Sequence, residues 1–361
     1  MKTHNFSAGP SILPQEVIRQ ASKAIMNINN LDLSILEISH RSKDFVDIID
    51  EARELTKKIL KIPQEYEVLF LQGGASLQFY MSALNLLETG GIGGYIDTGT
   101  WSTKAIKEAN KVGKVHVIAS SRDEGYKYLP KNIKLDKNID YLHFTSNNTI
   151  YGTQFKSFSE LYNLAQSRNA KLICDMSSDI FSKVFDISQF DLIYAGAQKN
   201  LGPAGATLII IKKEILKNNN ALPTYLNYST HIEKESMFNT PPVFSIYVAM
   251  LTLRWIQENG GLASIEKKNK NKANAMYDEI DRNPLFSGYT ENTDRSIMNA
   301  TFKLNNHKLE SEFKKLCHES RISGIYGHRS IGGYRASMYN ALEIDSVNKL
   351  IEIMQIIEKI S

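Results

Sequence analysis

The stretch Ala195-Gly-Ala-Gln-Lys-Asn-Leu-Gly-Pro-Ala-Gly205 does most to decide how this chain folds. The largely apolar run 191–194 precedes it, and the apolar run 206–211 follows it. Short runs of this kind, bounded by glycine and proline, are typical of buried strands. We therefore expect two successive strands of a sheet, with Lys199 held in the tight turn between them.

Lys199 is a candidate nucleophile because of that position. A lysine pinned at the edge of a sheet can form a Schiff base with an aldehyde cofactor when desolvation or nearby cations lower its pKa from about 10.4. Taken alone, a lysine in a glycine-rich loop is more often simply solvated. Which of the two interpretations holds therefore depends on the residues expected around Lys199.

Strand and helix patterns alternate through the first two thirds of the chain. Helical spacing of apolar residues occurs at 43–59, 77–87 and 243–256, and strand patterns occur at 66–71, 94–97, 115–119, 140–144 and 171–175. This alternation predicts an α/β fold with a mostly parallel sheet, whose ligands gather at the carboxyl ends of the strands. The pattern changes near residue 260, so we expect an N-terminal arm at 1–15, a large domain at 16–259 and a small domain at 260–361.

Composition and charge narrow the class of protein. The 361 residues are 42% hydrophobic and 23% charged, as in ordinary globular proteins. A net charge of +4 argues against nucleic acid as a partner and leaves small anionic ligands open. No stretch has the length and apolarity of a membrane span, no secretion signal is present, and the two cysteines lie far apart, so a cytoplasmic protein without disulfides is expected.

Three polar or aromatic positions follow predicted strands and could contact a cofactor. Asp175 ends the strand pattern 171–175 and either caps the next segment or holds a protonated pyridine nitrogen. Trp101 follows the turn after 94–97 and either packs in the core or stacks on a flat cofactor ring. The glycine turn at 73–76, which ends in Ser76, leaves amide groups suited to phosphate, and Thr149 is expected near the ring hydroxyl.

Arginines in two short motifs are candidates for binding anionic substrates. Arg41 lies in the segment 39–42, and Arg329 and Arg335 lie in the glycine-rich segment 327–335. Surface salt bridges are the ordinary alternative for each of them. Glycines around a guanidinium allow close backbone approach, which suits the capture of a carboxylate or a phosphate. His40 and His328 each precede an arginine and would give a second donor to a doubly charged anion.

Together these segments resemble the phosphoserine aminotransferases, a family of fold-type I pyridoxal phosphate enzymes. The resemblance extends over essentially the whole chain. It rests on Asp175 and on seven segments in matching order, 5–10, 39–42, 73–79, 145–153, 194–205, 238–242 and 327–340. It implies a large domain with a mostly parallel, seven-stranded type of sheet and a smaller α+β domain at the C-terminus.

The resemblance also implies a role for each candidate residue. Lys199 carries the pyridoxal 5'-phosphate, and Asp175 faces its pyridine nitrogen. The other cofactor contacts are Ala75, Ser76, Trp101, Thr149 and Gln198, with Asn239 and Thr240 reaching the phosphate of the neighbouring subunit in a homodimer. Arg335 binds the substrate α-carboxylate, and the side-chain anion is bound by His40, Arg41, His328 and Arg329. No metal is implied.

The implied reaction is a two-stage transamination. L-glutamate gives up its amino group and leaves as 2-oxoglutarate, and 3-phosphohydroxypyruvate then becomes O-phosphoserine, with 4-phosphohydroxythreonine of vitamin B6 synthesis as an open second substrate. Another fold-type I enzyme, such as an alanine–glyoxylate transaminase or a cysteine desulfurase, is one alternative. A regulator that binds the cofactor without catalysis is another. Cys317 lies on the apolar face of a predicted helix, which disfavours the exposed nucleophile that a desulfurase needs.

Overall fold

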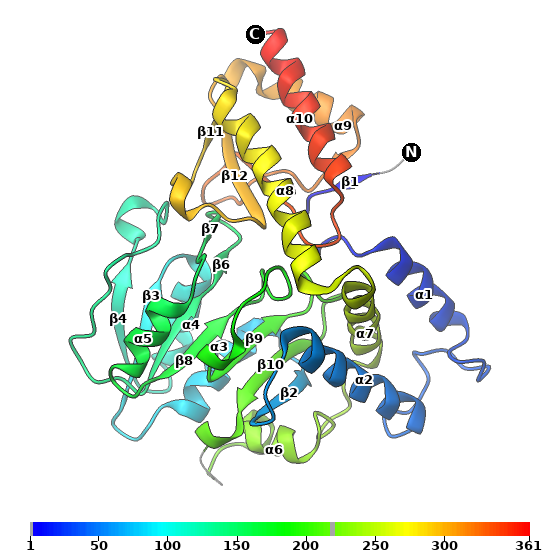
Figure 1. Ribbon diagram of the computed structural model, residues 1–361, viewed down its shortest axis with the longest axis vertical. Helices are drawn as coiled ribbons and strands as arrows, with labels where there is room; N and C mark the ends of the chain where they lie inside the picture. Colours follow the sequence, from blue (N-terminus) through cyan, green and yellow to red (C-terminus); the bar gives the residue numbers. More distant parts are fainter. Residues whose placement is uncertain (1–2, 217–220) are drawn as a thin grey trace.

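The computed structural model describes residues 3–216 and 221–361, and its larger part is built on one seven-stranded sheet (Figure 1). The strand order is β2-β10-β9-β8-β5-β3-β4. Strand β10 is antiparallel to both of its neighbours, and the other pairs in this sheet are parallel. The predicted α/β fold with a mostly parallel sheet is confirmed. The strands are β2 (Tyr66–Leu71), β3 (Ile92–Asp97), β4 (Lys114–Ser120), β5 (Tyr141–Thr145), β8 (Lys171–Asp175), β9 (Leu192–Gly196) and β10 (Thr207–Lys212).

Helices cover both faces of this sheet, which is why its central strands are buried along nearly their whole length and largely apolar. One face shares its core with α1 (Gln15–Met26), α2 (Lys43–Leu60), α5 (Ser159–Gln166) and α7 (Val243–Glu258). The other face packs against α3 (Gly74–Leu86), α4 (Thr100–Ala109) and α6 (Tyr228–Glu233). The amphipathic spacing read at 43–59 corresponds to α2, whose buried side includes Phe45, Ile48 and Ile49.

Among these elements of the large part, the starts of α3 and β3 differ from the sequence prediction by more than one residue, and glycines explain both. Helix α3 begins three residues before the predicted 77, because Gly73 has a φ of +88° and turns the chain directly into the helix. Strand β3 begins at Ile92 rather than at 94. A Cβ on Gly93 would meet the Tyr141 hydroxyl at 2.5 Å, so only a glycine lets β3 and the tyrosine of β5 approach this closely.

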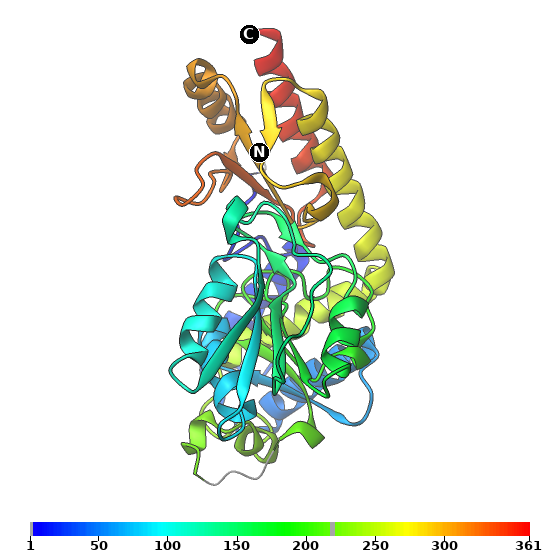
Figure 2. The same ribbon diagram turned by 90° about the vertical axis from the view of Figure 1, so that its left-hand side faces the viewer.

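The smaller part has its own apolar core and lies above the carboxyl end of the sheet in Figure 1. Helices α8 (Gly261–Arg282) and α10 (Ile344–Lys359) lie side by side in both views (Figure 2). They pack with α9 (Glu310–Glu319) and with the antiparallel sheet β11 (Phe286–Gly288), β12 (Asn299–Leu304) and β14 (Tyr334–Ser337). The division of the chain at residue 260 stays a prediction.

The N-terminal arm belongs to the core of the smaller part. Phe6 is fully buried there, and β1 (His4–Asn5) pairs with β13 (Ile322–Ser323). Strands β6 (Asn147–Asn148) and β7 (Thr153–Gln154) form a separate small ribbon between the two parts. Of the helices in residues 3–216 and 221–361, none combines the length and apolarity needed to cross a membrane.

Candidate active site

Lys199 lies in the turn that leads from β9 to β10, as the sequence predicted. The chain folds back on itself there, and the Lys199 amide donates to the carbonyl of Ala197 at 2.8 Å. Lys199 is only partly exposed, and desolvation by the surrounding chain lowers the pKa of its amine to about 8. The negative charge of Asp175 opposes that shift, and the positive charge of Arg335 adds to it. The lysine is therefore pinned and desolvated in the way that nucleophilic or basic lysines require.

The N-terminal arm packs against the Lys199 turn and bonds to its backbone. Ser11 donates its amide to the carbonyl of Gln198 at 3.0 Å and its hydroxyl to the carbonyl of Lys199. A Cβ on Gly9 would lie 3.5 Å from Cγ of Lys199, so the arm runs directly along the lysine side chain. Sequence analysis missed this role, because the two segments lie 188 residues apart in the chain.

Asp175 ends β8 beside the lysine turn and is only 4% exposed. Burial raises the pKa of its carboxyl, while hydrogen bonds from Ser177 and the charge of Lys199 act in the opposite direction. The Ser177 amide donates to Oδ1 at 2.9 Å, so this oxygen is fixed by the turn that follows the strand. Asp175 can hold a cationic ring nitrogen at the edge of the sheet.

Trp101 and Thr149 join the same site. The indole Nε1 of Trp101 donates to the hydroxyl of Thr149 at 3.0 Å, and the ring centroid lies 5.6 Å from Nζ of Lys199. Arg335 donates from Nη1 to the carbonyl of Thr149 at 3.1 Å. The structure thus brings together five residues that sequence analysis placed in one site: Asp175, Lys199, Trp101, Thr149 and Arg335.

The predicted phosphate turn lies at the start of α3. Helix α3 begins at Gly74, so the amides of Ala75 and Ser76 belong to its first turn and have no partner within the helix. Gly73 has to be glycine, because its φ is +88° and a Cβ there would meet Cδ2 of Leu77 at 2.5 Å. Gln198 directly precedes Lys199, and its side-chain amide folds over Gly196. These groups offer donors to an anion.

Several basic side chains gather near Arg335. Burial lowers the pKa of His328, and the charges of Arg335, Arg329 and Lys104 lower it further. Sequence analysis missed Lys104, although it lies one helical turn after Trp101 and its Nζ is 4.6 Å from the indole ring. Arg335 is half-buried, and its Nε has no hydrogen-bond partner in the described part of the chain. A negatively charged ligand would satisfy that donor.

Four predicted site residues are not brought to Lys199 within one chain. His40 and Arg41 lie in the turn before α2, and Arg41 is exposed. Asn239 and Thr240 are exposed in the loop before α7, and the Thr240 carbonyl accepts a hydrogen bond from Gln72. Within residues 3–216 and 221–361, no hydrogen bond or ion pair joins these four side chains to the Lys199 site. Their predicted roles stay predictions.

The comparisons with known proteins agree with this geometry. The sequence model of the family Aminotransferase class-V matches residues 3–350. Phosphoserine aminotransferase of Flavobacterium johnsoniae is 54% identical over 360 residues, which cover 99% of both chains. The chain belongs to the phosphoserine aminotransferase family of class-V aminotransferases.

Solved structures of the family have the same fold along the whole chain. A phosphoserine aminotransferase studied for radiation damage of its Schiff base is 46% identical, has a TM-score of 0.95 and covers 100% of both chains. The phosphoserine aminotransferase of Trichomonas vaginalis with PLP bound is 33% identical, has a TM-score of 0.91, and the match covers 98% of this chain and 100% of that one. The family resemblance read from the sequence is confirmed.

Proposed function

We propose that this protein transfers an amino group between L-glutamate and 3-phosphohydroxypyruvate, giving 2-oxoglutarate and O-phospho-L-serine in serine biosynthesis. One observation carries the proposal. The Lys199 amine, whose pKa is lowered, lies beside the ring of Trp101 and feels the charges of Asp175, which is buried, and of Arg335, whose Nε has no partner among the described residues. The relative in F. johnsoniae, which bears the corresponding name, matches this chain from end to end.

The cofactor is pyridoxal 5'-phosphate, and the side chains of the site fit it. Asp175 can hold the pyridine nitrogen, Trp101 and Thr149 the ring, and Lys199 the carbonyl carbon. The first-turn amides of α3 at Ala75 and Ser76, together with Gln198, would hold the phosphate. When bound, this cofactor supplies an aldehyde carbon and an electron-withdrawing ring that makes the substrate α-proton removable.

Lys199 moves the proton in this proposal. With a pKa of about 8, its Nζ is neutral in an appreciable fraction of molecules near neutral pH and can take the α-proton of the substrate. The Ser177 amide donates a hydrogen bond to one oxygen of Asp175, and this bond fixes the carboxylate beside the lysine turn. The N-terminal arm holds the backbone of Lys199, so the amine works from a fixed position.

The cations around Arg335 account for the choice of substrates. Arg335 binds the α-carboxylate shared by all amino-acid substrates, and His40, Arg41, His328 and Arg329 bind the anion at the other end. Glutamate carries a carboxylate there and phosphoserine a phosphate. Guanidinium groups and imidazole N–H groups can donate hydrogen bonds to either anion. The same arrangement would accept 4-phosphohydroxy-L-threonine as a second phosphorylated substrate.

The active protein is proposed to be a homodimer with shared sites. Among the described residues, no hydrogen bond or ion pair joins the side chains of His40, Arg41, Asn239 and Thr240 to the Lys199 site of their own chain, which a contribution to the partner's site would explain. Mixing Lys199→Ala protein with Arg41→Ala protein under conditions that exchange subunits, and assaying with phosphoserine, tests this. Random exchange makes about half of the dimers mixed, each with one intact site, so recovery of about a quarter of the activity supports shared sites. No recovery in verified mixed dimers would rule them out.

A cytoplasmic location is also proposed, and the two buried cysteines with free thiols are in keeping with a reducing compartment.

Cys317 is buried and burial raises the pKa of its thiol to about 12, which disfavours the desulfurase alternative. The alanine–glyoxylate aminotransferase of Nostoc sp. is 18% identical with a TM-score of 0.77, a likeness that extends to the fold alone.

The deciding experiment mixes the cofactor-loaded protein with phosphoserine, glutamate, alanine or cysteine and follows the visible absorbance of the bound cofactor. Selective loss of the band with phosphoserine and glutamate is expected. Loss with alanine or cysteine instead would assign the protein to another reaction. A band that no amino acid changes would point to a regulator without catalysis.

A further inference from the structure

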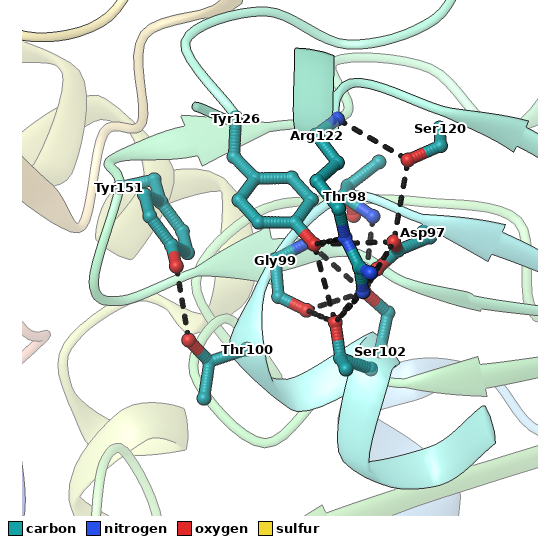
Figure 3. A network of polar contacts seen from close by, with 10 residues as sticks. Asp97, Thr98, Gly99, Thr100, Ser102, Ser120, Arg122, Tyr126 and Tyr151 are labelled. Atoms are coloured by element: carbon teal, nitrogen blue, oxygen red, sulfur yellow. Dashed lines mark hydrogen bonds and ion pairs between the residues drawn. The ribbon is translucent and has the colours of Figure 1, made fainter. Parts of the chain in front are cut away.

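A buried carboxylate outside the predicted site lies at the end of β3, beneath the turn into α4 (Figure 3). Asp97 is 3% exposed. Its Oδ1 accepts hydrogen bonds from the hydroxyls of Ser102 and Thr103, both at 3.0 Å. The Ser102 hydroxyl in turn accepts the amides of Thr98 and Gly99, both at 2.9 Å. Through Ser102, Asp97 holds the backbone of the turn at 98–99.

The second oxygen of Asp97 is held from another segment. Oδ2 accepts hydrogen bonds from Tyr126 at 3.1 Å and Ser120 at 3.2 Å and forms an ion pair with Arg122 at 3.2 Å. Arg122 also donates from Nε to the Tyr126 hydroxyl at 2.8 Å. Figure 3 shows these side chains converging on the carboxylate. Both carboxylate oxygens of Asp97 therefore accept several donors. A neutral amide, which has only one acceptor oxygen, could not accept all of them.

The turn held by Asp97 has little room to move. A Cβ on Gly99 would lie 2.8 Å from Oδ1 of Asn148 and 3.0 Å from Cδ2 of Tyr151, so the chain runs against the segment that carries Thr149. The hydroxyls of Thr100 and Tyr151 lie 3.0 Å apart and form a further hydrogen bond. The turn thus has a fixed position between Asp97 on one side and the segment 148–151 on the other.

Trp101 follows this turn directly, and its ring faces the lysine. The indole has one hydrogen bond of its own, to Thr149 at 3.0 Å, and its centroid lies 5.6 Å from Nζ of Lys199. One hydrogen bond fixes a single point of a flat ring. The orientation of the ring plane then depends on the backbone to which the side chain is attached. The backbone at 98–100 therefore sets the angle that the indole presents to the site.

We propose that Asp97 is a positioning residue for the cofactor, acting through Ser102 and the turn at 98–100 to set the plane of Trp101. This inference rests on the proposed function, because it takes the indole of Trp101 as the surface on which the pyridine ring stacks. Asp97 touches neither the cofactor nor the substrate. Its effect on cofactor binding therefore has to disappear when the indole is removed.

A double-mutant cycle tests this dependence, with two readouts besides activity. These are the dissociation constant for pyridoxal phosphate and the visible circular dichroism of the bound cofactor, which reports the orientation of its ring. Asp97→Asn keeps the shape but places an amide donor among the hydroxyl and guanidinium donors. It should weaken cofactor binding about tenfold and reduce the dichroism per bound cofactor. In a Trp101→Ala background the same change should weaken binding less than about twofold.

Asp123→Asn is the matched control, because it removes a carboxylate next to Arg122, in the segment that holds Oδ2 of Asp97. Asp123 is exposed and bonds only to the Tyr128 hydroxyl among the described residues, so cofactor binding should not change. Ser102→Ala is the second variant, since it cuts the link to the turn without changing a charge. It should reproduce the loss of dichroism even if Asp97→Asn fails to fold.

Three results would overturn the inference, the first two without touching the proposed function. A tenfold loss that persists in the Trp101→Ala background, or no effect of either Asp97→Asn or Ser102→Ala while Trp101→Ala weakens binding, would refute the positioning role alone. A Trp101→Ala protein with unchanged affinity and dichroism would refute the stacking role in the proposed function as well.

Discussion

The lowered pKa of Lys199 makes a prediction about the apo-protein that two charge variants can test. At a pKa of about 8, roughly one tenth of the amines are neutral at pH 7, against about 0.03% for an ordinary lysine of pKa 10.5. Only the neutral amine attacks an aldehyde, so Lys199 should capture pyridoxal phosphate about 300 times faster than an ordinary lysine of equal nucleophilicity. The capture rate should rise with pH and level off above about pH 8.

The neighbouring charges give the direction in which each variant moves this midpoint. Asp175 raises the pKa of Lys199, so Asp175→Asn should shift the midpoint to lower pH. Arg335 lowers that pKa, so Arg335→Gln should shift the midpoint to higher pH. Stopped-flow absorbance after mixing apo-protein with the cofactor measures the rates. The reaction of Nα-acetyl-lysine, whose ε-amine is free, in the same buffers corrects for titration of the cofactor itself. A midpoint near pH 10 for the unaltered protein, or shifts of the two variants in the same direction, would refute this account of the site.

Three further predictions concern stability and specificity. His143 is fully buried and desolvation lowers its pKa to about 3, so the unfolded state binds the extra proton. Stability should therefore fall by as much as about 4 kcal/mol as pH drops from 6.5 towards 3, and His143→Gln should flatten this fall in urea-unfolding curves. Gly73→Ala should cost about 2 kcal/mol and weaken cofactor binding, whereas Gly90→Ala, with a similar φ of +78° and open space, should keep normal cofactor affinity. Arg335→Gln should lower kcat/KM about a hundredfold for phosphoserine, glutamate and alanine alike, whereas Arg41→Gln should spare alanine, and equal losses for all three in both variants would contradict the assignment.

The strands and helices of the large part were predictable because their signals are local. The strands on either side of Lys199 show as apolar runs next to the glycine-rich turn, and α2 shows in the 3.6-residue spacing of Phe45, Ile48 and Ile49. The boundary errors lie at glycines, such as Gly73 before α3, whose backbone conformation depends on what packs nearby. Local sequence does not contain that information.

The contacts between distant segments could not be read in the same way. Ser11, which bonds to the Lys199 turn, and Tyr126, which bonds to Asp97, lie in loops whose own sequences predict no such contact. Such pairs are set by how the strands and the arm come together in three dimensions. The family resemblance supplied roles for Lys199 and Asp175, but the residues that hold the site in place have no motif of their own.

The N-terminal arm has a consequence for the order of events during synthesis. Residues 4–5 are made long before their strand partners at 322–323 and before Tyr339, whose hydroxyl donates to the Ala8 carbonyl at 2.8 Å. The sheet of the large part can form as the chain emerges, because its strands end at residue 212. The arm that steadies Lys199 cannot take its place until residues 322–339 have been made. A nascent chain stalled before residue 322 would then have the sheet and the lysine but lack the anchor for the arm, so the active site is complete only after synthesis has passed that segment.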